Sequence, residues 1–250
     1  MIERDELLTY LHELLDVGDF DDYCPNGLQV EGRREIRRLV TGVTACQALV
    51  DAAVAEGADA LLVHHGYFWK GEAPAVTGLK RRRLAALLGA EINLLAYHLP
   101  LDAHPALGNN AQLARRLGFV PEGGFGGRPA IGQYGHLEEP VDGAGLAARI
   151  EQRLGRAALH VPGQAAEIRR IAWCSGGAQG YIEQAAALGV DAYLSGEVSE
   201  QTVHIARETG LHFYAAGHHA TERYGAQALG EHLAERFDLA VHFVDIDNPA

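Results

Sequence analysis

The pattern of apolar and polar positions predicts that strands and helices alternate along most of the chain. Residues 3–15 place leucines at helical spacing, which predicts an amphipathic helix. A turn-rich segment follows, because Pro25 and Gly27 both interrupt regular structure. Beyond it, short apolar runs of strand length alternate with helical segments rich in alanine or leucine. This alternation is typical of an α/β fold with parallel strands.

Two stretches of the chain, residues 37–65 and 169–197, align with each other without a gap. Nine of their 29 positions are identical, whereas ordinary composition gives about two or three. Each copy reads as an apolar run, a small-residue turn, an alanine-rich helix, a glycine and a second apolar run, which predicts a duplicated βαβ unit with a right-handed crossover. The identical pairs are Arg37/Arg169, Arg38/Arg170, Gln47/Gln179, Ala53/Ala185, Ala55/Ala187, Gly57/Gly189, Asp59/Asp191, Ala60/Ala192 and Leu62/Leu194.

The correspondence continues beyond these units. Residues 92–102 and 211–222 are each an apolar run that ends in a histidine, with an acid four residues later, and a helical segment follows both. The duplication predicts a two-lobed α/β protein. Because residues 123–135 are glycine-rich and lie between the copies, we expect a linker or lobe boundary there, with lobes of about 1–124 and 125–250.

Composition and charge narrow the classes of function. Hydrophobic residues make up 48% and charged residues 22%, as in ordinary globular proteins. The formal net charge of −12 argues against general affinity for nucleic acid or anionic membranes. The charged N-terminus is unlike a signal peptide, and no apolar run has the length needed to cross a bilayer.

Cysteine usage favours a reducing compartment. Cys24, Cys46 and Cys174 are far apart and form neither a disulfide framework nor a CxxC metal motif. We therefore expect a cytoplasmic protein, with Cys46 and Cys174 acting as small buried hydrophobic residues.

Three histidine clusters, drawn from thirteen histidines, follow apolar runs. They are His64–His65, His98 with Asp102, and His218 with Glu222. Ligand sites in open α/β sheets lie beyond the carboxyl ends of strands, where these clusters are expected. Imidazole and carboxylate donors without sulfur suit Zn, Mn, Fe, Co or Ni. Any one cluster alone could be a group of surface or hydrogen-bonded histidines, but three at corresponding positions favour a metal site.

Three further features have a plain and a functional interpretation. Residues 175–180 form a glycine-rich connection that could cradle a phosphate, but a tight turn is the favoured interpretation. Glu197 occupies the position of His65 in the second copy, which makes it either a base facing the same cleft or a surface glutamate. The basic run 80–83 begins an apparent helix and is either a solvated face, which is the usual case, or, in a ring assembly, the lining of a channel.

Long motifs in the chain are also similar to those of a known family. They are YCPNGLQVEG (23–32), TGVTACQAL (41–49), HHGYFWKGE (64–72), HLPLDAHPALGNNAQLA (98–114) and the region 196–223 that contains GEVSEQ and HFYAAGHHATER. Through these the sequence resembles the YbgI-type dinuclear-metal-centre hexameric proteins, often labelled GTP cyclohydrolase 1 type 2 homologs. The resemblance runs from about residue 21 to 249 and is weakest over 120–162.

The resemblance implies a two-lobed subunit in a ring-shaped homohexamer, a trimer of dimers, with two divalent transition metal ions per subunit between the lobes. The family's ligands carry over to His64, His65, Asp102, His218 and Glu222. His98 matches a nearby family histidine that acts as acid, base or support.

These features together predict a metal-dependent hydrolase of a nucleotide or related small molecule, GTP cyclohydrolase type 2-like by resemblance. Water made acidic by two cations would be the nucleophile, and His98 or Glu197 would carry protons. The alternative is a non-enzymatic metal carrier or insertion factor, which would use the same five ligands. A ring clamped around nucleic acid, as in radiation protection, is disfavoured by the net charge of −12.

Overall fold

The computed structural model describes residues 1–250 and confirms the α/β class. The chain forms two compact units, one from Met1–Leu101 with Gly225–Asp247 and the other from Asp102–Tyr224 with Asn248–Ala250. These ranges differ from the expected lobes of 1–124 and 125–250. The reason is that the C-terminal segment returns to add a strand to the first sheet, while the segment after residue 102 adds a helix and a strand to the second unit.

The first unit is built on a five-stranded sheet with the order β13-β4-β5-β6-β2. The four strands β13, β4, β5 and β6 run parallel to one another, and β2 runs antiparallel beside β6. The short strands β1 and β3 pair separately. The elements are β1 (Ile2–Glu3), α1 (Arg4–Leu14), η1 (Val17–Asp19), β2 (Gly27–Val30), β3 (Glu35–Ile36), β4 (Arg38–Thr44), α2 (Gln47–Ala55), β5 (Ala60–His65), α3 (Gly78–Gly89), β6 (Asn93–Ala96), α4 (Leu99–Ala103), α9 (His218–Phe237) and β13 (Ala240–Phe243). The boundary between the units falls within α4 and again within α9.

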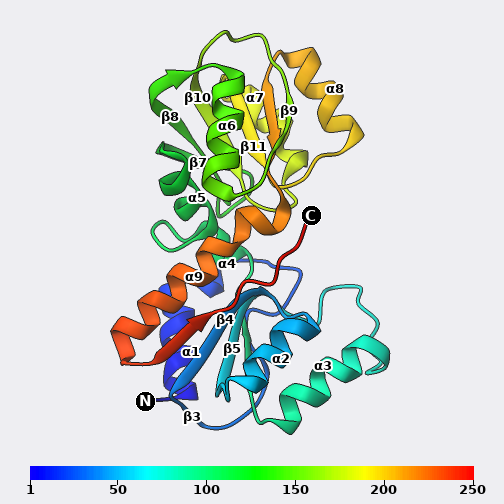
Figure 1. Ribbon diagram of the computed structural model, residues 1–250, viewed down its shortest axis with the longest axis vertical. Coiled ribbons are helices and arrows are strands. Elements are labelled where there is room, and N and C mark those ends of the chain that lie inside the picture. Colours follow the sequence, from blue (N-terminus) through cyan, green and yellow to red (C-terminus); the bar gives the residue numbers. More distant parts are fainter. The chain divides into compact units, whose positions relative to one another are not determined.

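Helices cover both faces of this first sheet, with α2 and α3 on one side and α1 and the C-terminal part of α9 on the other (Figure 1). Alternate residues of the strands supply the two faces, because side chains on a strand point to opposite sides in turn. Val40 and Val63 join the core under α2 and α3. Thr41, the next residue after Val40, faces Gly230 of α9. The expected N-terminal helix is confirmed as α1, and the helix expected to begin with the basic run 80–83 is confirmed as α3.

The second unit is built on a six-stranded sheet with the order β7-β8-β10-β11-β12-β9. Strands β10, β11 and β12 are parallel, while β8 and β9 run antiparallel beside them. The elements are α5 (Asn109–Leu117), β7 (Phe119–Phe125), β8 (Gly132–Val141), α6 (Gly143–Leu154), β9 (Leu159–Val161), β10 (Ile168–Cys174), η2 (Gln179–Tyr181), α7 (Ile182–Ala187), β11 (Ala192–Ser195), α8 (Glu200–Thr209) and β12 (His212–Ala215).

The second sheet also has a core on each face. Ile171 and Trp173 pack with α5 and α6, and the intervening Ala172 and the following Cys174 pack with α7 and α8. Cys174 is therefore a small buried hydrophobic residue, as expected, and all three cysteines are free thiols. Cys46, which is half-buried, packs against the core of the first unit.

The predicted duplication is confirmed at the level of single hydrogen bonds. The aligned copies fold as β4-α2-β5 and β10-η2-α7-β11, each with its two strands parallel. Asp59 accepts hydrogen bonds from two consecutive backbone amides, 37 and 38, at 2.8 and 2.9 Å. Asp191 does the same for amides 169 and 170 at the same two distances. The glycine that ends each helix, Gly57 or Gly189, has a positive φ of 62° or 66°.

The expectation of a linker at residues 123–135 was wrong, because this segment belongs to the antiparallel β7–β8 pair of the second sheet. The glycines there allow close packing rather than flexibility. A Cβ on Gly135 would collide with the carbonyl of Val120, and a Cβ on Gly123 would lie 2.5 Å from the hydroxyl of Tyr134. Glycine is required where another chain segment comes this close.

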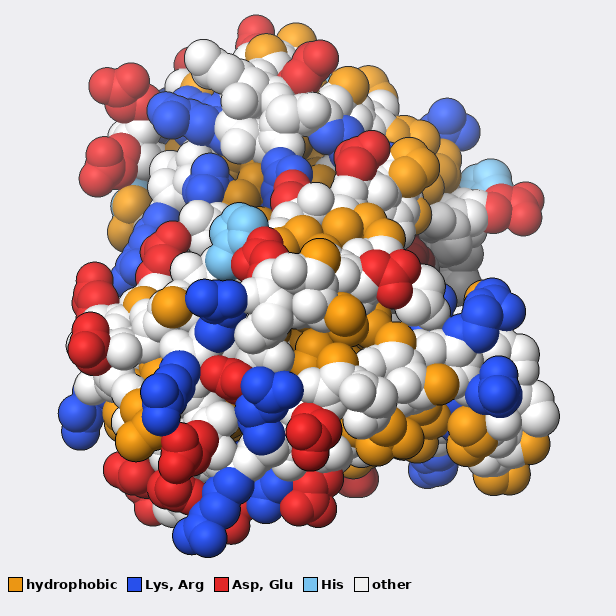
Figure 2. Space-filling model, turned by 60° about the horizontal axis from the view of Figure 1, so that its bottom comes forward, with side chains coloured by type: hydrophobic (Ala, Val, Ile, Leu, Met, Phe, Trp, Pro, Cys, Tyr) orange, Lys and Arg blue, Asp and Glu red, His pale blue; other side chains and the backbone are white.

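The surface in Figure 2 carries acidic and basic side chains intermingled, with no broad basic area on that face. This mixture agrees with the net charge of −12. None of the helices combines the length and the apolar character that a bilayer crossing needs.

Candidate metal centre

Three histidines of the first unit gather at the carboxyl edge of its parallel strands. His64 and His65 end β5, and His98 comes two residues after β6. Because β5 and β6 are parallel neighbours, their carboxyl ends lie side by side. The ring centroid of His64 lies 4.5 Å from that of His65 and 5.1 Å from that of His98. One nitrogen from each lies within 4.8 Å of the others, close enough to share a metal ion.

The Nδ1 atoms of His64 and His65 are both engaged by the surrounding protein. His64 Nδ1 donates to the backbone carbonyl of Tyr97 at 3.0 Å, and His65 Nδ1 lies 3.0 Å from the hydroxyl of Thr44. Metal-binding histidines commonly have such partners, which fix the ring and present the other nitrogen, Nε2, to the metal. His64 is fully buried, so its ring is held by packing as well.

Asp22 holds His98, and sequence reasoning did not single it out. Its carboxylate accepts a hydrogen bond from His98 Nδ1 at 2.9 Å and another from the backbone amide of Leu99 at 3.0 Å. It also accepts one from Asn26 at 2.9 Å, while Asn26 in turn accepts one from the His98 amide at 2.7 Å. Burial acts to raise the pKa of Asp22, but these donors outweigh it and lower the pKa to about 2. The carboxylate is therefore charged and oriented. The sequence did offer one indication of its role, because Asp22 directly precedes the motif 23–32 that resembles the family.

Cys24 lies in the same cluster as Asp22 and His98 but is a poor metal ligand. Burial, and then the nearby charge of Asp22, raises the pKa of the Cys24 thiol to about 12. Metals bind the thiolate form, which this surrounding disfavours. The donors of the first unit are therefore imidazole nitrogens.

The second unit has candidate ligands of its own, and the first along the chain is the carboxylate of Asp102. Its Oδ1 accepts hydrogen bonds from the side-chain amide of Asn109 at 2.9 Å and from the hydroxyl of Ser175 at 3.1 Å. The backbone carbonyl of Asp102 accepts from Asn110, whose own Oδ1 accepts from the Ser175 amide. This network ties a buried acid to the carboxyl end of β10.

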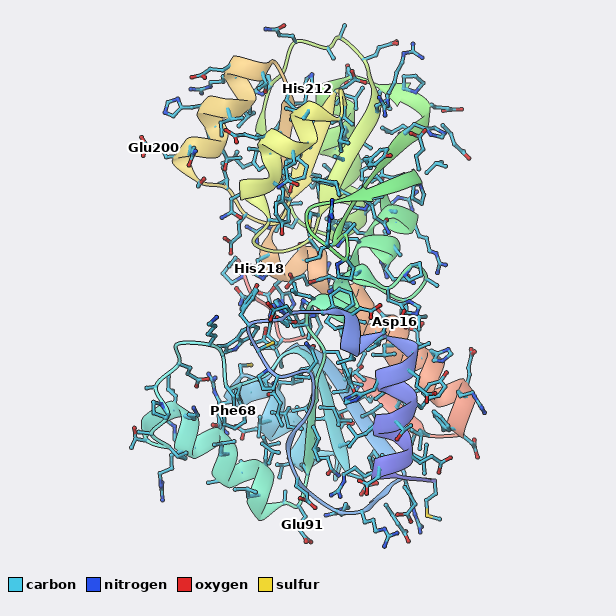
Figure 3. The ribbon with its side chains drawn as sticks, turned by 180° about the vertical axis from the view of Figure 1, so that it is seen from behind. Asp16, Phe68, Glu91, Glu200, His212 and His218 are labelled. Atoms are coloured by element: carbon cyan, nitrogen blue, oxygen red, sulfur yellow. The ribbon has the colours of Figure 1, made fainter.

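His218 and Glu222 begin α9 and share a face of that helix, as their spacing of four residues predicted. His218 Nε2 lies 3.0 Å from a carboxylate oxygen of Glu222, which is buried. His218 Nδ1 donates to Glu197 at 2.7 Å, so Glu197 does face the site in its own unit. Burial acts to lower the pKa of His218, but the two carboxylates outweigh it and raise the pKa to about 9. Figure 3 marks His218 at the start of α9.

The glycine-rich connection 175–180 is a turn, as favoured from the sequence. The amides of Ser175 and Gly176 already donate to Asn110 and Thr221, so they are not available to cradle a phosphate. Gly176 has a φ of +64°, and a Cβ there would collide with the carboxylate of Glu222. The turn therefore serves to let Glu222 lie against the backbone.

Comparison with known proteins gives this arrangement a family context. The family model Duf34/NIF3 (NGG1p interacting factor 3) matches residues 2–249. The chain belongs to the Duf34/NIF3 family. This NIF3-family chain is 61% identical over 246 residues to a Yersinia pestis protein named GTP cyclohydrolase 1 type 2 homolog, covering 98% of each. An Escherichia coli (strain K12) protein of the same name is 56% identical over 250 residues, covering all of both chains.

Solved structures agree with this assignment to the NIF3 family. The protein ybgI, described as of unknown function, is 55% identical with a TM-score of 0.97, and the match covers all of both chains. TTHA1606 from Thermus thermophilus is 36% identical with a TM-score of 0.92, again over all of both chains. The resemblance inferred from the motifs is thereby confirmed. HcgD from Methanocaldococcus jannaschii, at 23% identity and a TM-score of 0.86 over 98% of each chain, shares the fold.

Proposed function

We propose that this protein is a metal-dependent hydrolase of a nucleotide or related small molecule. Divalent transition metal ions would be held by His64, His65, Asp102, His218 and Glu222. One observation supports the proposal most strongly. Buried imidazoles and carboxylates follow the strands of both copies, and hydrogen bonds already orient them, as for His64 and Asp102. The name shared by the bacterial relatives, GTP cyclohydrolase 1 type 2 homolog, supports a nucleotide as the substrate class.

The donor atoms fit borderline transition metals. Imidazole nitrogen and carboxylate oxygen are the ligands that Zn, Mn, Fe, Co and Ni accept, and the nearby thiols are protonated and buried. When bound, such cations lower the pKa of water and polarise the group that is attacked.

Two carboxylate–imidazole pairs would handle protons. Asp22 keeps the Nδ1 proton on His98, so the Nε2 atom of His98 would exchange protons with substrate. Glu197 would hold the His218 ring in place by accepting from its Nδ1, and, with its side chain 43% exposed, it would exchange protons with substrate directly. Both residues are catalytic candidates from the sequence, and both have the partner that such a role requires.

The test combines metal analysis with a nucleotide panel. Purified protein is expected to contain about two equivalents of transition metal and to hydrolyse at least one nucleotide. His64→Ala and Glu222→Ala should lose metal and activity while keeping their helix content, because each unit has its own hydrophobic core. His136→Ala is the matched control, since His136 of β8 pairs with Glu122 of the neighbouring β7 and is not one of the proposed ligands.

The outcomes separate the proposal from its rival. Retention of full metal by both site variants would overturn the ligand assignment. Metal that is present without turnover of any nucleotide, and that leaks to a mild chelator, would contradict the hydrolase and favour a metal carrier or insertion factor.

We also propose that six copies assemble as a trimer of dimers, on the strength of the family resemblance. Light scattering on a size-exclusion column is expected to give six times the chain mass of 26.9 kDa. A monomer mass at micromolar concentration would contradict the hexamer.

A further inference from the structure

Two aromatic side chains, Tyr23 and Trp69, stand beside the histidine cluster of the first unit. Their ring centroids lie 5.6 Å apart with planes tilted by 38°. Each meets the ring of His98 edge to face, at 5.0 Å for Tyr23 and 5.1 Å for Trp69. Trp69 also lies 5.9 Å from His65. The two rings therefore flank the candidate proton carrier and a candidate metal ligand.

The backbone segments that carry these rings are tied together. The amide of Lys70 donates to the carbonyl of Tyr23 at 2.7 Å, which links the turn before β2 to the segment after β5. The indole Nε1 of Trp69 donates to the carbonyl of Gly66 at 3.2 Å, and the amide of Trp69 donates to Glu72 at 3.1 Å. The rings are thus held in place by their own segments rather than by the core.

Both side chains are more exposed than the aromatic residues buried in the cores. Tyr23 is 53% exposed and Trp69 is half-buried, and neither is part of a hydrophobic core. By contrast Trp173, Tyr97, Tyr193 and Tyr214 are fully buried. An oriented aromatic pair at the surface beside a candidate reaction centre suits contact with a planar ligand, because aromatic rings attract one another in stacked or edge-to-face arrangements.

We propose that Tyr23 and Trp69 form a stacking platform for the planar heteroaromatic ring of the substrate, of the purine class. The inference rests on the proposed function, because it names the ring that would lie beside His98 and His65. A nucleobase offers a π-face of the size and rigidity that such a platform accepts, whatever its hydrogen-bonding edge. The proposed contact is made to the base, so a sugar phosphate without a base serves as the control ligand.

The fluorescence of Trp69 itself can report whether a ligand binds at the platform. The chain has two tryptophans, and the other, Trp173, is fully buried in the second unit. Titrating the metal-containing protein with guanosine is expected to quench Trp69 fluorescence with saturation, whereas ribose 5-phosphate leaves it unchanged. Tyr23→Leu should weaken guanosine binding by roughly tenfold, the size of one lost stacking contact, and Tyr23→Phe should retain it.

Phe68→Leu is the matched control in the same segment. Phe68, labelled in Figure 3, is 39% exposed, but its ring packs against Tyr67 and Lys80 instead of the histidines. Its loss should leave guanosine affinity within about twofold, because no stacking contact is removed. Trp69→Leu, measured by calorimetry, should weaken binding as Tyr23→Leu does, with metal content unchanged.

The results distinguish this inference from the proposed function. Saturable guanosine binding that depends on Tyr23 and Trp69 supports the platform even if no nucleotide is turned over. Nucleotide hydrolysis that is unchanged in Tyr23→Leu and Trp69→Leu, with no quenching by guanosine, would overturn the platform and leave the hydrolase standing.

Discussion

Individual side chains at the ends of strands set the geometry of the candidate centre. Asp22 is the most connected of them, since its carboxylate gathers His98, Asn26 and the amide of Leu99 around one buried charge. Partners of this kind orient the groups that bind metal or move protons, and their loss commonly costs roughly 10–100-fold in affinity or activity.

Asp22→Asn is expected to lower metal affinity or nucleotide turnover by roughly tenfold to a hundredfold. The amide oxygen of Asn can still accept from His98 Nδ1, but it lacks the negative charge, so it holds the ring less firmly. Metal titration and kcat/KM measure the effect. Asp21→Asn, at an exposed neighbouring carboxylate, is the control and should behave as the wild type. If Asp22→Asn and Asp21→Asn showed the same metal affinity and the same kcat/KM, the proposed role of Asp22 would be contradicted.

Gly176→Ala is expected to destabilise the protein by about 1–2 kcal/mol and to weaken metal binding. Alanine is strained at a φ of +64°, and its Cβ would displace the carboxylate of Glu222. Gly177→Ala is a matched control, because its Cβ would come no closer than 3.6 Å to Glu197. Urea unfolding and metal analysis of both variants test the difference, and an unaffected Gly176→Ala protein would count against the proposed packing.

Elements are joined by side-chain contacts that the strand pattern does not reveal. On β9 and β12, His160 Nε2 lies 3.1 Å from His212 Nδ1, and His212 Nε2 donates to the carbonyl of Ala165 at 2.9 Å. His160 stacks on Tyr214 with centroids 4.5 Å apart. The strand β12 that carries His212 is in the second unit, where Figure 3 labels that residue. A hydrogen bond between two imidazole nitrogens needs one nitrogen without a proton, so protonation of both rings would break this contact. The contact at this edge of the sheet is therefore sensitive to acid.

The contribution of His160 to stability is expected to fall in acid. Burial lowers the pKa of His160 and the nearby His212 lowers it further, so the folded pKa lies below the ordinary 6.5. The unfolded chain then takes up the proton first. Stability from this group is present above about pH 6.5 and is lost as the pH falls through the folded pKa.

The measurement compares urea unfolding of His160→Gln with the unchanged histidine between about pH 8 and pH 5, a range that spans the ordinary histidine pKa. Both carry Trp69→Phe, so that fluorescence reports Trp173 in the same unit. The difference in unfolding free energy should shrink as the pH falls. A difference that stays constant, or grows in acid, would contradict a folded pKa of His160 below the ordinary value.

At the scale of the whole molecule, the duplication is the main organising feature. The two units repeat the βαβ core and even its anchoring carboxylates, Asp59 and Asp191. They diverge at the site, where His65 of one copy corresponds to Glu197 of the other. The end of β5 in the first unit thus carries imidazoles, whereas the corresponding position of the second unit carries a carboxylate.

Asp59→Ala and Asp191→Ala are each expected to lower the free energy of unfolding by about 2 kcal/mol or more, because each removes a charged acceptor from two backbone amides. Asp59 also pairs with Arg33 at 3.0 Å, so its loss should cost at least as much. Denaturant unfolding followed at Trp69 for the first unit and Trp173 for the second tests this. A negligible effect in either unit would show that the repeated contact is not equally important.

The sequence alone determined the fold class, the duplication and the family. These follow from local periodicity and from identical residues at matching positions, such as Asp59 and Asp191, which any reading of the chain can detect. It also named the clusters around His64, His98 and His218, because residues that follow consecutive parallel strands must lie at one edge of a sheet.

Only the tertiary structure decided which residues support these clusters and where the chain divides. Asp22 reaches His98 across 76 residues, and Ser175 reaches Asp102 across 73. The glycines of 123–135 resembled a linker because local composition does not distinguish a flexible segment from a strand in tight contact with its neighbour. The C-terminal strand β13 joins the first sheet through β4. Contacts between residues so distant in the chain arise from packing, which leaves no periodic trace in the sequence.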